Sequence, residues 1–215
     1  MIYLRQLVLI CFALGEEAEP LPWKVWGWRT ISILVTGIGR KNAEKSVRDF
    51  LADHTPKLVL TCGFAGGLNP ELAGGTVIFS AADHSEMAQK LTAAGARPAR
   101  FHCAERIATT AAEKQELRRA TGADAVEMES EVIHAVCRER GIPCATIRVI
   151  SDTADEDLPL DFNQFAKPDQ SLAYGKLALA IVKSPGKIFA LLRLQRRCRF
   201  AAGRLAGILA KVILE

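Results

Sequence analysis

Short apolar runs alternate along the chain with segments of helical periodicity. Runs rich in branched apolar residues predict strands, and they lie at 7–13, 30–36, 57–62, 75–81 and 144–150. Apolar positions three or four residues apart predict helices at 41–54, 85–94, 111–121 and 129–140. Alternation of this kind favours a three-layer α/β/α architecture built around a central sheet.

Composition is that of a globular protein with one main core. The 215 residues are 49% hydrophobic and 24% charged, which is enough apolar material for a single domain. The six cysteines form no CxxC pair and have no histidine at ligand spacing, so we expect no metal site and reduced thiols in a cytoplasmic protein. The apolar stretch 1–14 has the length of a signal peptide, but we interpret it as the first buried strand.

The segment 125–155 carries the clearest chemical signal. It predicts a helix that ends at Gly141-Ile142-Pro143, followed by a strand that places Ser151 and Asp152 at its carboxyl end. Ligand clefts of open α/β sheets lie outside the carboxyl ends of strands. Asp152 is therefore the first catalytic candidate, and the competing interpretation is a residue that caps the next turn.

Four motifs occur in an order that resembles one enzyme superfamily. They are Gly37-Ile38-Gly39, the glycine-rich run TCGFAGGL at 61–68, EMES at 127–130 and RVISDTAD at 148–155. Together they resemble the nucleoside phosphorylases and nucleosidases, including methylthioadenosine/S-adenosylhomocysteine nucleosidases and futalosine hydrolases. The resemblance extends to about residue 165. It implies a mixed central sheet, a homo-oligomer, cleavage of an N-glycosidic bond, and no cofactor, with inorganic phosphate as co-substrate in some members.

The resemblance assigns a role to each of two carboxylates. By this resemblance Asp152 protonates N7 of a purine or donates a hydrogen bond to it, which requires a carboxyl group that burial and its neighbours keep protonated. Glu129 accepts hydrogen bonds from the ribose hydroxyls, and Met128 packs under the sugar. We interpret Glu127 as a first-turn acid that favours the helix dipole, and Glu131 as a solvated charge on the helix face.

Glu17, which follows the first strand, matches the nucleosidase glutamate that orients the attacking water. Phosphorolytic relatives tend to carry an arginine in this region. An anion is still conceivable here, because Gly63 can present a backbone N–H group and Thr61 or Arg40 can assist. Hydrolysis and phosphorolysis therefore both stay open.

Two positions depart from the nucleosidase pattern. Phe64 replaces a small hydroxyl residue of the glycine-rich loop, and Arg106 replaces the aromatic residue that stacks on the purine. Ile107 matches the position whose backbone contacts adenine. These departures indicate a substrate other than methylthioadenosine.

The last 33 residues differ in charge from the rest of the chain. They carry eight basic residues and one acid, whereas residues 1–182 carry 20 basic and 23 acidic residues. We therefore divide the chain into a catalytic domain, 1–182, and a basic amphipathic helical tail, 183–215. The stripe predicted on this helix is Leu191, Leu194, Cys198, Ala201, Leu205, Ile208, Leu209 and Val212.

This helix has two possible locations. It can lie on an anionic membrane surface, in contact through residues 188–214, or it can dock on the enzyme's own core or at a subunit interface. The tail, Phe64 and the tryptophan segment 20–28 resemble the hopanoid-associated phosphorylases, which implies adenosylhopane, a lipid-linked adenosine, as the substrate. Localisation is then cytoplasmic, with contact at the inner face of the membrane. A soluble methylthioadenosine, S-adenosylhomocysteine or futalosine nucleosidase is the alternative, and the lack of interleaved aromatics argues against nucleic acid as a partner.

Overall fold

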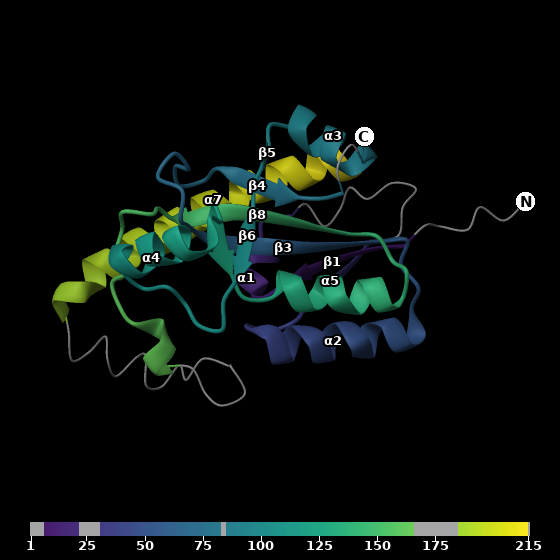
Figure 1. Ribbon diagram of the computed structural model, residues 1–215, viewed down its shortest axis with the longest axis horizontal. Coiled ribbons are helices and arrows are strands. Elements are labelled where there is room, and N and C mark those ends of the chain that lie inside the picture. The colour runs from purple at the N-terminus through teal and green to yellow at the C-terminus, as the bar shows by residue number, and fades with distance from the viewer. Residues whose placement is uncertain (1–6, 22–30, 83–84, 166–184, 215) are drawn as a thin grey trace, which may run out of the picture.

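The protein folds as three layers, with helices on both faces of a mixed sheet (Figure 1). The computed structural model describes residues 7–21, 31–82, 85–165 and 185–214. Residues 22–28 of the tryptophan segment and the first six residues lie outside these ranges. The expected α/β/α class with a mixed sheet and a C-terminal helix is confirmed.

The sheet places the longest strands at its centre. Its main path runs β2 (Ile31–Val35), β1 (Val8–Phe12), β3 (Leu58–Gly67), β8 (Cys144–Asp152), β4 (Val77–Ser80) and β5 (Arg97–Pro98). The first four of these strands are parallel, whereas β4 runs antiparallel to β8. Off this path, β7 (Ala125–Glu127) pairs with β3 and with β6 (Phe101–Cys103). The carboxyl ends of β1, β2, β3 and β8 therefore meet at one edge.

Two helices cover one face of the sheet. They are α2 (Arg40–Asp53) and α5 (Ser130–Glu139), which lie side by side below the sheet in Figure 1. Their buried side chains, among them Val47, Leu51 and Ile133, pack against Leu9 and Val59. This core uses the periodic apolar positions that predicted the two helices.

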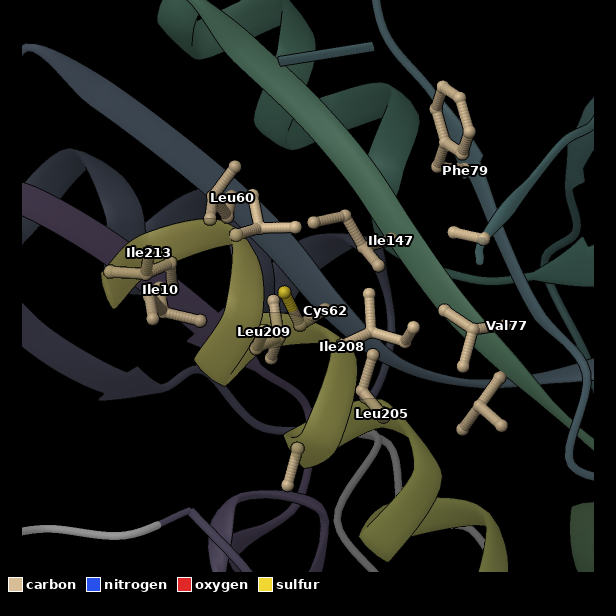
Figure 2. Packing of buried hydrophobic residues seen from close by; sticks show 14 of the residues in the cluster. Ile10, Leu60, Cys62, Val77, Phe79, Ile147, Leu205, Ile208, Leu209 and Ile213 are labelled. Carbon is tan, nitrogen blue, oxygen red and sulfur yellow. The ribbon is translucent and has the colours of Figure 1, made fainter. Parts of the chain in front are cut away.

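The opposite face is covered mainly by α7 (Ile188–Leu214), with α3 (Glu86–Ala93) and α1 (Gly15–Ala18) beside it. Figure 2 shows Leu205, Ile208, Leu209 and Ile213 of α7 against strand residues that include Ile10 and Ile147. Of the two locations predicted for the tail, docking on the core therefore describes residues 201–213.

The first half of α7 extends beyond this core. Ile188, Phe189, Leu192 and Phe200 are large apolar residues that stay exposed there, Phe189 at 75%. By contrast, Leu191, Leu194 and Cys198 of the predicted stripe are half-buried. The exposed apolar face is therefore not the predicted stripe but a different side of the helix.

Further short elements complete the chain. They are α4 (Ala111–Thr121), the 3-10 turn Phe162–Phe165 and the 3-10 turn Pro185–Lys187. The strand predicted at 57–62 continues to Gly67, and β5, β6 and β7 were not predicted. These three strands have only two or three residues each, which is too short for a periodic signal.

Candidate active site

Polar side chains gather where the parallel strands end. Glu17 follows β1, Asp152 ends β8, and Glu129 lies between β7 and α5. All three are nearly inaccessible to solvent, although carboxylates are seldom buried without a partner. Lys114 pairs with Asp152 and Arg148 with Glu129, and the charge of Arg148 also acts on Glu17.

Arg148 links the groups of this edge. From inside β8, its Nη2 donates to Glu127 Oε2 at 2.6 Å, to Thr61 Oγ1 at 3.2 Å and to Glu129 Oε2 at 3.4 Å. Its Nη1 donates to the carbonyl oxygen of Cys62 at 3.0 Å. Burial alone would lower the pKa of this guanidinium, but the neighbouring glutamates reverse the effect and raise it. Arg148 is therefore a permanent positive charge in the site.

Glu127 is not in the first turn of the helix, where we expected it. It ends β7, and its side chain is 1% exposed. Its carboxylate accepts from the backbone N–H groups of Glu129 and Ser130 and from Ser130 Oγ, so it also fixes the start of α5. Burial favours a raised pKa, but Arg148 and these hydrogen bonds outweigh it and lower the pKa of Glu127. Glu131 matches its expected surface position, with a side chain 63% exposed.

Glu17 lies against the glycine-rich strand. Its two oxygens accept from the N–H groups of Leu14 and Phe64, at 2.9 and 2.8 Å. A Cβ atom on Gly63 would stand 2.6 Å from Glu17 Oε1 and 2.7 Å from Arg148 Nη1, so only glycine allows this approach. Burial raises the pKa of Glu17 to about 7, although Arg148 opposes the shift. The carboxyl group therefore titrates in the neutral range.

Glu129 is held from two sides. Its Oε1 accepts from the backbone N–H of Gly39 at 2.8 Å, and its Oε2 faces Arg148. Burial raises the pKa of Glu129, Arg148 lowers it, and the nearby Glu127 raises it further, so the net direction is upward. Gly39 thus contributes a backbone donor to this carboxylate, and Met128 next to Glu129 is half-buried.

Asp152 has two close neighbours. Ser151 Oγ donates to Oδ1 at 2.7 Å, and Lys114 Nζ of α4 lies 2.5 Å from Oδ2. The second contact has the separation of an ion pair but not the direction of a hydrogen bond. Lys114 is completely buried and was not predicted as part of the site.

Ile107 is engaged through its backbone. The side-chain amide of Asn163 accepts from Ile107 N and donates to Ile107 O, both at 2.9 Å. Adenine presents a similar pair, a ring nitrogen acceptor beside an amino donor. Ile107 and Phe64 are half-buried, and the amide shows that the Ile107 backbone can bind such a pair.

The predicted anion-binding set is only partly brought together. Thr61 and Gly63 both lie beside Arg148, whereas Arg40 pairs with Glu131 at 2.7 Å on the partly exposed side of the site. Arg106 pairs with Glu113 at 2.7 Å, and its side chain is 63% exposed. A hollow of about 360 Å³ lies between β6 and α4. It is lined by Arg106 and Glu113 but by none of Glu17, Glu129 and Asp152.

The described ranges contain no group of three or more histidine, cysteine, aspartate or glutamate side chains that could hold a metal ion. In the same part of the chain, no helix is both long and apolar enough to cross a membrane.

Comparison with known proteins identifies a family and related enzymes. The family described as the phosphorylase superfamily matches residues 25–101 and 85–183. A 5'-methylthioadenosine/S-adenosylhomocysteine nucleosidase of Anoxybacillus flavithermus is 29% identical over 171 residues, covering 63% of this chain and 73% of that protein.

Solved structures show the same fold over the whole chain. Futalosine hydrolase of Helicobacter pylori superposes with a TM-score of 0.72 at 18% identity, covering 99% of both chains. S-adenosylhomocysteine nucleosidase of Streptococcus pyogenes, in complex with 5-methylthiotubericidin, gives 0.72 at 14% identity, with 100% of this chain and 98% of that chain covered.

The chain belongs to the phosphorylase superfamily, because the family match covers most of its length. The prediction of this superfamily from four ordered motifs is confirmed, and with it the prediction of an enzyme that cleaves an N-glycosidic bond.

Proposed function

We propose that the enzyme hydrolyses the N-glycosidic bond of a 5'-modified adenosine and releases adenine. The observation that carries this proposal is the gathering of Glu17, Glu129 and Asp152 at one edge of the sheet, with Arg148 between the two glutamates. The family and its nucleosidase relatives support the same class of reaction.

Each carboxylate has a distinct task in this reaction. As the bond breaks, positive charge develops on the ribosyl ring and electrons move into the base. Asp152 gives a proton to N7, Glu129 holds the ribose hydroxyls, and Glu17 orients and deprotonates water. A pKa of about 7 suits the last task, because a general base works best when its pKa lies near the operating pH.

The charges around Glu17 favour water over phosphate as the nucleophile. Glu17, Glu127 and Glu129 surround the single guanidinium of Arg148, so the cluster has no excess positive charge for a phosphate anion. Arg40, the other candidate for gripping an anion, pairs with Glu131.

We further propose that the substrate is a lipid-linked adenosine, with adenosylhopane as the candidate, and that the enzyme is a homo-oligomer that binds the cytoplasmic face of a membrane peripherally. The exposed face of α7 supports membrane contact: Phe189, Leu192 and Phe200 stand among exposed arginines, and α7 contains no acidic residue. Within the described ranges, Arg193, Arg196 and Arg199 form no ion pair.

This half of α7 also borders the carboxylates. Arg197 pairs with Glu156, four residues after Asp152. Burial, with the charges of Asp152 and Glu17, raises the pKa of Cys198 to about 11. The same helix contacts α1, which carries Glu17, and β8, which ends at Asp152. A membrane bound by the exposed face would therefore lie on the side of the molecule that carries these two carboxyl groups.

The reaction is tested with adenosylhopane and methylthioadenosine in parallel, each with and without phosphate. We expect adenine to be released from adenosylhopane without a requirement for phosphate. The lipid-linked ribose should then carry a hydroxyl group at its anomeric carbon, and not a phosphate. Asp152→Asn should lower turnover about a hundredfold or more while the protein stays folded. Near-normal turnover by the folded variant would remove Asp152 from the mechanism, and turnover of methylthioadenosine alone would favour the soluble nucleosidase.

Membrane contact needs point variants, because residues 201–213 belong to the core and cannot be deleted. A double variant, Phe189→Ser with Leu192→Ser, should lose sedimentation with anionic vesicles. Val35→Ser is the matched control, because Val35 is also apolar and 51% exposed but lies on β2. Loss of vesicle binding in both variants, or in neither, would contradict the proposal that α7 binds the membrane. The proposed homo-oligomer is tested separately by light scattering.

A further inference from the structure

Lys114 occupies an unusual position for a lysine. It lies in the first turn of α4, and its side chain is completely buried. Its Nζ donates to the carbonyl oxygens of Thr153 and Glu156, at 2.8 and 2.9 Å. The remaining side of the ammonium group faces Asp152 Oδ2 at 2.5 Å.

The turn that receives Lys114 is already fixed by other contacts. Glu156 accepts from Thr153 N and pairs with Arg197, while Asp157 accepts from Ala111 N at the start of α4. Thr110 and Glu113 cap the same helix start reciprocally. Holding the turn does not by itself require a buried charge at residue 114.

Stability is also a poor reason to bury Lys114 beside Asp152. While Asp152 is protonated, the buried ammonium group has no counter-charge there, and even a full ion pair returns less than the desolvation of its two charges costs in many proteins. Lys114 is therefore better explained by what it does to Asp152, which the proposed function makes the proton donor.

We propose that Lys114 is a positioning residue for Asp152 in glycosidic cleavage. Its ammonium group fixes the carboxyl group at the end of β8 and stabilises the negative charge that Asp152 acquires during the reaction. The C1'–N9 bond breaks and its electron pair moves into the base, the Asp152 proton passes to N7, and Asp152 is left as a carboxylate. Lys114 keeps its protons throughout. This inference rests on the proposed function.

The position of Lys114 suits this role. Oδ2 faces the ammonium group and accepts no hydrogen bond from another described residue, so Lys114 is its main source of positive charge. Oδ1 carries the Ser151 hydrogen bond on the other side of the group. A charge-compensated carboxylate is a better product of proton transfer than an isolated one in a buried site.

The test compares two leaving groups in the full-length enzyme. Adenosylhopane, or whichever 5'-modified adenosine the wild type cleaves, needs a proton on the departing base, whereas 4-nitrophenyl β-D-ribofuranoside releases a stable phenolate without one. Lys114→Gln removes the charge but keeps donors for the two carbonyls, and Lys114→Met removes both. We expect each variant, like Asp152→Asn, to lose about tenfold or more in kcat on the adenosine substrate and less than threefold on the nitrophenyl riboside.

Two controls separate charge from fold. Lys114→Arg restores the charge and should recover part of the lost kcat. Glu156→Gln loosens the same turn without touching the ammonium group, and it should not discriminate between the two substrates. Urea unfolding verifies that each variant is folded.

The outcomes are distinguishable. Equal losses of the Lys114 variants on both substrates, or the same discrimination by Glu156→Gln, would overturn the role of Lys114. If Lys114→Met does not fold, Lys114→Gln and Lys114→Arg still test the role of Lys114. The quantity compared is the loss of kcat on the adenosine substrate relative to the loss on the nitrophenyl riboside. A wild-type enzyme that releases no adenine from any 5'-modified adenosine would overturn the proposed function together with this inference.

Discussion

Glu17 should make the stability of the enzyme depend on pH in a predictable direction. Burial raises its pKa from 4.5 to about 7, so the folded protein favours the neutral carboxyl group more than the unfolded chain does. The stabilisation is fully present below the unfolded pKa of 4.5 and is lost as the pH rises through about 7. The gap between these two values corresponds to about 3 kcal/mol.

The assay compares urea unfolding of the wild type and Glu17→Gln between pH 5 and pH 8. Glutamine is uncharged at every pH, and other titrating groups cancel in the difference between the two proteins. Losing one backbone hydrogen bond should cost the variant a constant amount, about 1 kcal/mol. Relative to the wild type, the variant should then gain about 2 to 3 kcal/mol from pH 5 to pH 8.

A stability difference that stays constant over this range would show that Glu17 is not held neutral by burial. The catalytic assignment is tested separately, because ionised Glu17 is needed to activate water. Activity should rise through pH 7 in the wild type, and Glu17→Gln should abolish that rise. A variant with an unchanged pH profile would exclude Glu17 as the base.

Three further variants test other parts of the site. Glu129→Gln should reduce turnover of a ribosyl substrate far more than that of its 2',3'-dideoxy analogue, and equal losses would assign the carboxylate to structure alone. Asn163→Ala frees the backbone of Ile107 and should tighten adenine binding several-fold in calorimetry; weaker binding would mean that the amide supports the site instead. Arg148→Met leaves buried glutamates uncompensated and should cost about 3 to 5 kcal/mol in urea unfolding, whereas a loss below 1 kcal/mol would contradict its linking role.

The local pattern of apolar and polar residues was enough to predict the long strands and helices of this fold. The branched apolar runs around Leu9, Leu60 and Ile147 became central strands, because burial on both faces demands such runs. The two- and three-residue strands β5, β6 and β7 had no detectable period. Their pairing depends on contacts between segments that are distant along the chain.

Site residues that lie in or near a recognisable motif could be predicted from the sequence. A site residue that comes from a segment without a motif could not. Glu17, Glu129 and Asp152 stand in or near motifs. Arg148 lies within the motif at 148–155, but we predicted no role for it. A charged residue inside an apolar strand could have indicated that it belongs to the site. Lys114 offers no such signal, because its helix contains several charged residues and only the fold reveals which of them points inward.

The position of α7 has a consequence for how the protein is made. The strands of the described ranges precede α7 in the chain, so they leave the ribosome before the helix that covers one of their faces. Until Leu205, Leu209 and Ile213 have emerged, the apolar side chains of β1, β3 and β8 on that face lack the cover that α7 gives them. The nascent chain is therefore exposed to aggregation until α7 has been made, and shortening α7 should reduce the yield of soluble protein before it alters any property of the site.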